Sequence, residues 1–352
     1  MKRKTIAGLW ILGLLAVSAC VDPIAVEMQR SANAQLVVEG WVNDVDDVFT
    51  VSLSTSSTLD GVEPVNIGVG ADVRIVTGSG QVANLREISP GKYITTFGEL
   101  RGVVGETYTL EMDLLNGSSY RSTAETLPTP VRVGDGRVEL NEFRGETDER
   151  VPIVSYSHRV FVNLENTEDQ HFVRLSASGW AQLRIDYPLC GGFDGTGGPA
   201  GDLLCWAFRE PVERDINTVS NVGLSGNTYE AQAVNIPADF RARYITDVAA
   251  NAMSIEAFRY WENAKGQLNR GGGIFDPPFA PVIGNISNIA DPQEVVLGYF
   301  HAYAQTNTRV CFSRNDVPGF FPIPVISCER TCTDFYAPAV FELPFDDDAI
   351  CP

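Results

Sequence analysis

The thiol groups in the body of this 352-residue chain are its most reactive side chains, and their number and spacing favour disulfides. They belong to Cys190, Cys205, Cys311, Cys328, Cys332 and Cys351. An even set of thiols favours disulfides in a protein that leaves the reducing cytoplasm. Cys190 and Cys205 flank a glycine-rich loop that their pairing would close. A zinc site is the alternative, but Cys328 and Cys332 have neither a second close cysteine pair nor nearby histidines.

Residues with the spacing of a catalytic site are sparse. The histidines are His158, His171 and His301, and none stands in a His-Glu-x-x-His metal motif. His158 and His171 fall on expected strands and could face each other across a hairpin, although a structural role is expected for each. Gly223-Leu224-Ser225-Gly226 has the wrong spacing for a nucleophile elbow, and no two of the 45 acidic residues stand out as paired acids. We therefore expect no catalytic residues, no metal and no cofactor.

Two short acidic runs are the candidates for calcium binding through oxygen ligands. They are Asp44 with Asp46 and Asp47, and Asp346 with Asp347 and Asp348. Neither run has the glycine and distal glutamate of an EF-hand loop, and short acidic runs are usually solvated. Solvated carboxylates are therefore the favoured interpretation.

Aromatic side chains in or near loop-rich stretches are the candidates for contact with a ligand or partner. They are Trp180, Tyr187, Trp206, Phe320 and Phe321. Exposed rings stack on sugars or anchor a partner protein, whereas buried rings fill a core. Both interpretations stay open for these residues, with core packing favoured, and Phe320 and Phe321 next to a proline are the best surface candidates.

The first 20 residues have the layout of an export signal with a lipid attachment site. Lys2, Arg3 and Lys4 precede an apolar run that is shorter than the about 20 residues needed to span a membrane. Small residues then lead to Cys20, an arrangement that resembles a bacterial lipobox, in which the cysteine is acylated. We expect a signal peptide over residues 1–19 and a lipid-anchored tether over residues 20–34, with an ordinary signal peptide as the alternative.

The composition suits a folded, acidic protein. Apolar residues make up 44% of the chain, which is enough for packed cores, and the formal net charge is −19. An acidic surface repels phosphate backbones, so nucleic-acid binding is excluded as a function class. The charge also argues against adsorption to anionic lipid head groups, and it serves solubility as well.

Alternating apolar and polar residues between residues 35 and 130 predict a sheet-rich first domain. The expected strands are 36–42, 48–54, 72–77, 81–88, 92–97, 107–114 and 119–125. Turn signals such as Pro90-Gly91 and Asn116-Gly117 separate them. Short strands at this spacing indicate an immunoglobulin-like β-sandwich, with Leu127-Pro128-Thr129-Pro130 as a linker.

Residues 131–352 are expected to form a larger β-rich domain with a disulfide-stapled end. The expected strands are 151–164, 171–187 and 234–248. One helix is expected over residues 254–265, with Ser254 as its N-cap and Gly266 as its stop. The residues Ile255, Phe258, Trp261 and Ala264 recur at helical spacing and predict one buried stripe.

Four separate blocks of the sequence resemble a family of Bacteroidota lipoproteins that share a domain of unknown function, number 4249 (DUF4249). Together they span nearly the whole chain, although each alone is weak, and the loop from Cys190 to Cys205 has no counterpart in the family pattern. The blocks are Cys20 to Ile24 with Leu36 to Gly40; Gly91 to Tyr93 with Gly105 to Leu110 and Leu127-Pro128; Ser254 to Trp261; and Gly273 to Pro278 with Gly284 to Ile286 and Val296 to Phe300.

The resemblance implies a surface-exposed outer-membrane lipoprotein of a type found beside TonB-dependent receptors. No catalytic motif comes with it. We therefore expect a non-enzymatic accessory subunit that docks on a TonB-dependent receptor or a similar outer-membrane barrel and helps capture or admit a substrate. A stand-alone surface module that binds a glycan or peptide is the alternative, and a hydrolase is the third and least favoured possibility.

Overall fold

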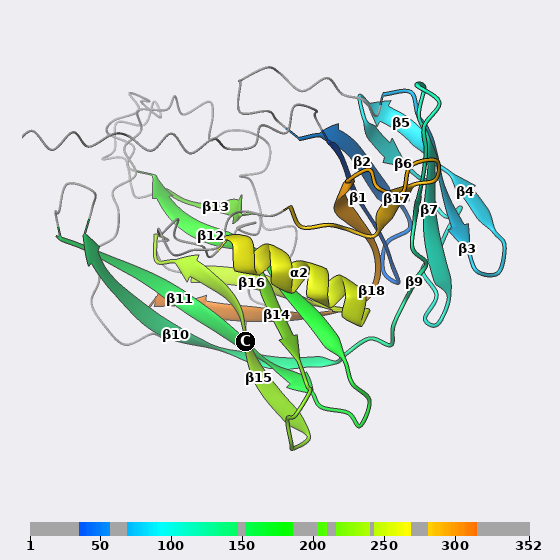
Figure 1. Ribbon diagram of the computed structural model, residues 1–352. Coiled ribbons are helices and arrows are strands. Elements are labelled where there is room, and N and C mark those ends of the chain that lie inside the picture. The colour runs from blue at the N-terminus through cyan, green and yellow to red at the C-terminus, as the bar shows by residue number, and fades with distance from the viewer. Residues whose placement is uncertain are drawn as a thin grey trace, which may run out of the picture. The chain divides into compact units, whose positions relative to one another are not determined.

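The computed structural model describes residues 35–56, 69–146, 152–185, 203–209, 216–239, 243–268 and 281–314 (Figure 1). The described residues are mainly strands, with one helix among them, α2 (Ile255–Leu268). The prediction of a mainly β protein is therefore confirmed. The expected signal peptide and tether lie outside the described residues.

A nine-stranded sheet, here called the long sheet, runs through the structure. Its strands in spatial order are β13 (Leu203–Arg209), β12 (Phe172–Ile185), β16 (Arg243–Met253), β18 (Leu297–Ser313), β1 (Leu36–Asn43), β2 (Thr50–Thr55), β6 (Lys92–Ile94) and β5 (Arg86–Ser89), and β14 (Asn217–Ser220) pairs with β12. Most neighbouring strands are antiparallel, but β1 and β18 are parallel. The long sheet thus joins the first strand of the described chain to the last.

Two smaller sheets pack against the long sheet and enclose two cores. The six-stranded sheet contains β17 (Ile286–Asn288), β8 (Ser119–Ser122), β7 (Thr107–Asp113), β3 (Asp72–Thr77) and β4 (Val82–Asn84), with β9 (Glu125–Thr126) paired to β7. The three-stranded sheet contains β10 (Val133–Glu146), β11 (Pro152–Glu165) and β15 (Thr228–Pro237). Val38 and Leu110 are buried in the first core, and Val162 and Val248 in the second.

Strand β18 contributes to both cores. Phe300 and Ala302 pack in the first core, whereas Val310 and Phe312 pack in the second. The sequence placed a domain boundary near residue 130, and the structure shows that β17 and β18, from beyond that boundary, complete the two sheets around the first core. Residues distant in sequence therefore build this core together.

The strands expected before residue 130 are found with shifts at their ends, because their alternation matches one buried face. The segment 81–88 is interrupted between β4 and β5 at Leu85, which is buried. The single strand expected over 234–248 is wrong, since this segment holds the end of β15 and the start of β16, which lie in different sheets. The long strand β10 was not expected.

Helix α2 begins as predicted. The Oγ of Ser254 accepts a hydrogen bond from the backbone N–H of Ala257 at 3.1 Å, which is N-cap geometry. The predicted stop at Gly266 is wrong, because Gly266 does not adopt the left-handed conformation and the helix continues to Leu268. The predicted stripe is only half-buried, and the fully buried helix residue is Ala257.

Gly298 is required where β18 meets β1. It has a φ of +86°, and a Cβ there would lie 2.0 Å from the carbonyl oxygen of Val38. Gly105 has the same φ of +86°, but a Cβ there would have no atom within 4 Å. The two glycines thus share one backbone conformation and differ in the space around it.

We predict that Gly298→Ala lowers the free energy of unfolding by about 2 to 5 kcal/mol, because left-handed strain and backbone overlap add together. Gly105→Ala serves as the matched control and should lower it by only about 1 to 2 kcal/mol, from the strain alone. Urea unfolding followed by fluorescence measures both. Equal losses in the two variants would contradict a tight β1–β18 contact.

Candidate functional site

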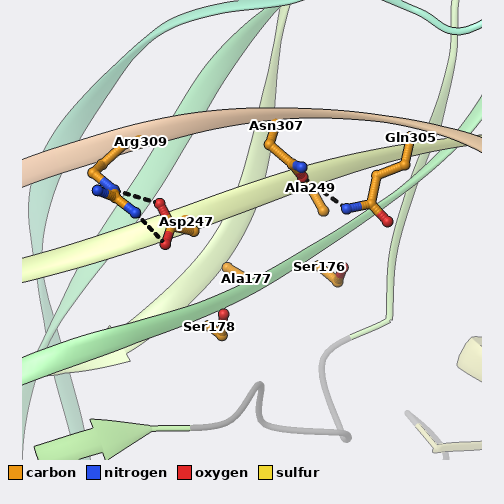
Figure 2. A pocket seen from close by; sticks show the side chains of 8 residues that line it. All are labelled: Ser176, Ala177, Ser178, Asp247, Ala249, Gln305, Asn307 and Arg309. Atoms are coloured by element: carbon orange, nitrogen blue, oxygen red, sulfur yellow. Dashed lines mark hydrogen bonds and ion pairs between the residues drawn. The ribbon is translucent and has the colours of Figure 1, made fainter. Parts of the chain in front are cut away.

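The candidate site is a polar groove on the outer face of the long sheet, which is the face of β12, β16 and β18 that points away from the second core (Figure 2). Its volume is about 390 Å³, within the range of small-ligand pockets. The lining residues are Ser176, Ala177, Ser178, Asp247, Ala249, Gln305, Asn307 and Arg309. No predicted site residue is among them.

Strand alternation and register bring these residues together. In β12, Leu175 and Ala177 are buried toward the second core, so Ser176 and Ser178 face the other side. The pairing places Ser178 opposite Asp247 and Ser176 opposite Ala249. On the next strand, Arg309 stands opposite Asp247 and Asn307 opposite Ala249. Small residues on β12 and β16 leave the hollow, and longer polar side chains of β18 form its wall.

The two charges of the groove neutralise each other. The guanidinium of Arg309 donates to both carboxylate oxygens of Asp247, at 2.6 and 2.8 Å (Figure 2). These hydrogen bonds raise the pKa of Arg309 above its usual value. The groove therefore carries an internal ion pair with no net charge.

Amide groups and the hydroxyls of Ser176 and Ser178 supply the remaining polarity of the groove. The Nε2 of Gln305 donates to the Oδ1 of Asn307 at 2.9 Å. At the same end of the groove, the Nδ2 of Asn251 donates to the Oγ of Ser176 at 3.3 Å. The Oδ1 of Asn251 is buried and has no hydrogen-bond partner in the described part of the chain.

Helix α2 covers the neighbouring part of the same outer face with an aromatic cluster. Arg174, two residues before Ser176 on β12, places its guanidinium 3.8 Å from the ring centre of Trp261. The cluster also contains Phe172, Phe258, Tyr260, Tyr299 and Tyr303. The helix occupies one part of this face and leaves the groove beside it open. The helical spacing predicted the stripe that contains Phe258 and Trp261, but it did not predict the strand residues that they contact.

The histidines lie in three separate places. His301 lies at the aromatic cluster, where burial lowers its pKa to about 3, so its imidazole is neutral at physiological pH. His158 packs against Phe312 in the second core, and burial lowers its pKa to about 4. His171 shares a hydrogen bond of 2.9 Å with the hydroxyl of Tyr229.

The suggested hairpin between His158 and His171 is wrong. His158 is on β11 in the three-stranded sheet, and His171 immediately precedes β12 of the long sheet. The two strands pair with other partners, since β11 lies between β10 and β15. The chain between them therefore crosses from one sheet to the other.

Only some of the other predicted site residues lie within the described residues. Trp180 is half-buried on the outer face of β12, and its ring centre lies 5.1 Å from that of Phe208 on β13. Trp206 and Cys205 belong to β13, and Cys311 is half-buried on β18. The remaining candidates lie outside the described residues, namely Cys20, Tyr187, Cys190, Phe320, Phe321, Cys328, Cys332, Asp346, Asp347, Asp348 and Cys351.

The acidic run near residue 44 has structural partners. Asp44 accepts the backbone N–H of Gln305, Asp46 accepts the side-chain amide of Asn43, and Asp47 pairs with Arg101. Within the described residues, no group of three or more acidic, histidine or cysteine side chains could hold a metal ion.

A buried carboxylate, Glu125, ties four chain segments together. Its Oε1 accepts the hydroxyl of Tyr299 at 2.6 Å and the Nδ2 of Asn285 at 3.2 Å. Its Oε2 accepts the hydroxyl of Ser254, the N-cap of α2, at 2.7 Å. Burial raises the pKa of Glu125 above its usual value, and the three hydrogen bonds oppose that shift.

The fold is mainly β, and its long sheet carries a polar groove on β12, β16 and β18. Residues 21–309 match the family model described as "Domain of unknown function (DUF4249)", and the chain belongs to this family. A search of curated proteins finds no match. No helix in the described ranges is long and apolar enough to cross a membrane.

Two of the four sequence blocks that carry the family resemblance supply donors to Glu125. Ser254 comes from one block, and Asn285 and Tyr299 come from another. The Nδ2 of Asn285 also donates to the backbone oxygen of Phe300 at 2.7 Å. These two blocks thus contribute to a structural junction, whereas the residues that line the groove lie outside them.

We predict that Glu125→Ala lowers the free energy of unfolding by about 3 kcal/mol or more, because it leaves several buried donors unsatisfied. Glu125→Gln keeps an acceptor and should lower it by less. Urea unfolding at neutral pH measures both losses. A Glu125→Ala loss no larger than that of Glu125→Gln would contradict the junction.

The pH dependence of stability provides a separate test of the same carboxyl. The pKa of Glu125 is raised in the folded state. Its contribution to the free energy of unfolding is therefore complete below the usual carboxyl pKa, and it is lost as the pH rises through the raised pKa. We expect Glu125→Gln to remove this loss from urea unfolding measured over a pH series. The control is Glu230→Gln, which removes a carboxyl whose pKa is lowered by a hydrogen bond from Arg137. This variant keeps Glu125, so the loss of stability at rising pH should persist.

Proposed function

We propose that this chain is a non-enzymatic, lipid-anchored outer-membrane protein of Bacteroidota that serves as an accessory subunit of a TonB-dependent receptor or similar barrel. In this proposal the groove on the long sheet captures a ligand for uptake. The groove is the observation that carries the proposal, because it is a hollow of ligand size that strand pairing forms from side chains. The strands before residue 130, completed by β17 and β18, would form an immunoglobulin-like sandwich.

The chemistry of the lining supports binding more than catalysis. Hydroxyls and amides bind polar ligands, and the one carboxylate of the lining, Asp247, is held by Arg309 in two hydrogen bonds. Both oxygens of that carboxylate accept hydrogen bonds from the guanidinium of Arg309, so they are already engaged within the lining. The lining can therefore hold a ligand without activating a nucleophile.

The anchor of the proposed protein is Cys20. The charge of −19 opposes attraction to anionic lipid head groups, so acyl chains would supply the membrane affinity. The six further cysteines would form disulfides in the oxidising space outside the cytoplasm, with Cys205 and Cys311 the two that fall in described strands.

We predict that Cys20→Ala abolishes acylation and releases the protein from the membrane. The measurement is the share of protein in the membrane pellet after cell fractionation, together with the intact mass of the purified chain. Asn163→Ala serves as the control, because it alters an exposed residue of β11 without touching the lipobox. Membrane retention of Cys20→Ala with an unchanged mass would contradict lipid anchoring.

Docking on a barrel is tested by affinity copurification from membranes solubilised in mild detergent. We expect an outer-membrane barrel to copurify with the wild-type chain at a fixed ratio. The control bait is Asn163→Ala, an exposed change on β11, which should recover the same partner. Recovery of the chain alone under these conditions would contradict the accessory role.

A stand-alone surface binding module is the second candidate function. It is favoured by the aromatic pair Trp180 and Phe208, which lies on the same sheet face as the groove. Such a module would bind its ligand with the same affinity whether or not a barrel is present. Ligand binding without a copurified barrel would therefore favour this candidate over the accessory role.

A further inference from the structure

We infer that the groove binds a neutral carbohydrate. The hydroxyls and amides of its lining form hydrogen bonds with the sugar, and Trp180 provides a stacking surface. This inference rests on the proposed capture function, which it deepens by naming the ligand class. Three features carry it: the charge balance of the groove, its mixture of donors and acceptors, and the aromatic residue at its end.

The charge balance disfavours charged ligands. The guanidinium of Arg309 and the carboxylate of Asp247 are paired through two hydrogen bonds, so neither presents an isolated charge to an anion or a cation. Arg174, the nearest cation along β12, lies over the ring of Trp261 beneath α2. The net charge of −19 adds a field that repels anions from the whole protein.

The donors and acceptors of the groove match a hydroxyl-rich ligand. The bond from Gln305 to Asn307 uses one donor and one acceptor, and it leaves the Oε1 of Gln305 and the Nδ2 of Asn307 without partners among the described residues. Ser176 and Ser178 add hydroxyls that both donate and accept. A sugar hydroxyl also donates and accepts, so it can form a hydrogen bond with each amide or hydroxyl group of the lining.

Trp180 extends this surface along β12. It is the next outer-face residue after Ser178, since alternate residues of a strand share a face. Its contact with Phe208, which is 45% exposed, holds the indole at the end of the groove. The face of an aromatic ring packs against the apolar face of a sugar ring, whereas the hydroxyls at the sugar edge reach the polar lining.

Backbone pairing along the groove centres on β16. This strand pairs with β12 on one side and with β18 on the other throughout the groove. The described pairing of β18 with β1 ends at Tyr303, so at residues 305–309 β18 pairs with β16 alone. A peptide that adds as a strand needs an exposed sheet edge, which β16 does not offer, whereas an oligosaccharide needs only the side chains of the lining.

The test is binding of the mature, detergent-solubilised chain to neutral gluco-, manno-, galacto- and xylo-oligosaccharides, measured by calorimetry. Uronate-containing and sulfated glycans and a peptide library serve as the other probes. We expect a neutral oligosaccharide to bind, with an affinity that salt does not change, because no charge takes part. Binding of acidic glycans or peptides alone, or of no probe, would overturn the inference.

Variants place the ligand in the groove. Asn307→Ala removes an exposed donor and should weaken binding about five- to tenfold. Ala249→Leu, which fills the hollow without removing a polar group, should abolish binding. The control Asn163→Ala changes the same residue type on β11 and should leave the affinity unchanged. Wild-type affinity in both groove variants would overturn the inference.

The outcomes separate this inference from the docking role. If a barrel copurifies but no neutral oligosaccharide binds, the ligand class is wrong and docking stands. If a neutral oligosaccharide binds and no barrel copurifies, the ligand class is right and docking is wrong.

Discussion

The parallel pairing of β1 with β18 is the constraint on which the rest of the structure depends. It joins the first described strand to the last, and parallel neighbours require a long connection, which here is almost the whole described chain. Because β18 is 17 residues long, its first half packs in one core and its second half in the other. The close approach of Gly298 to Val38 fixes the register of this pairing.

The Glu125 junction secures the same region from the side of the six-stranded sheet. Glu125 accepts hydrogen bonds from the start of α2, from the segment before β17 and from β18. A buried carboxylate is costly unless it is satisfied in this way, so its partners must be present together. Ser254, Asn285 and Tyr299 are therefore far from Glu125 in the chain and beside it in the structure.

The groove follows from the same pairings and from residue size. β12, β16 and β18 carry small or polar residues on their outer face, whereas the aromatic cluster under α2 covers the adjoining part of that face. Had the outer positions of Ser176 and Ala249 held large apolar residues, the hollow would be filled. The ion pair of Asp247 and Arg309 then sets the character of the surface, because it cancels the charges of the groove from within.

The sequence alone determined the features that depend on near neighbours. Alternation predicted the strands before residue 130, glycine turns separated them, and Ser254 predicted the start of α2, because these signals act over a few residues. Only the tertiary structure decided which strands pair, so the His158–His171 hairpin was wrong and the groove was not foreseen. A period of two tells which side chains share a face of one strand, but it does not identify the strand beside it. Ser176, Ala249 and Asn307 belong to distant parts of the chain, and long-range backbone pairing alone places them in one groove.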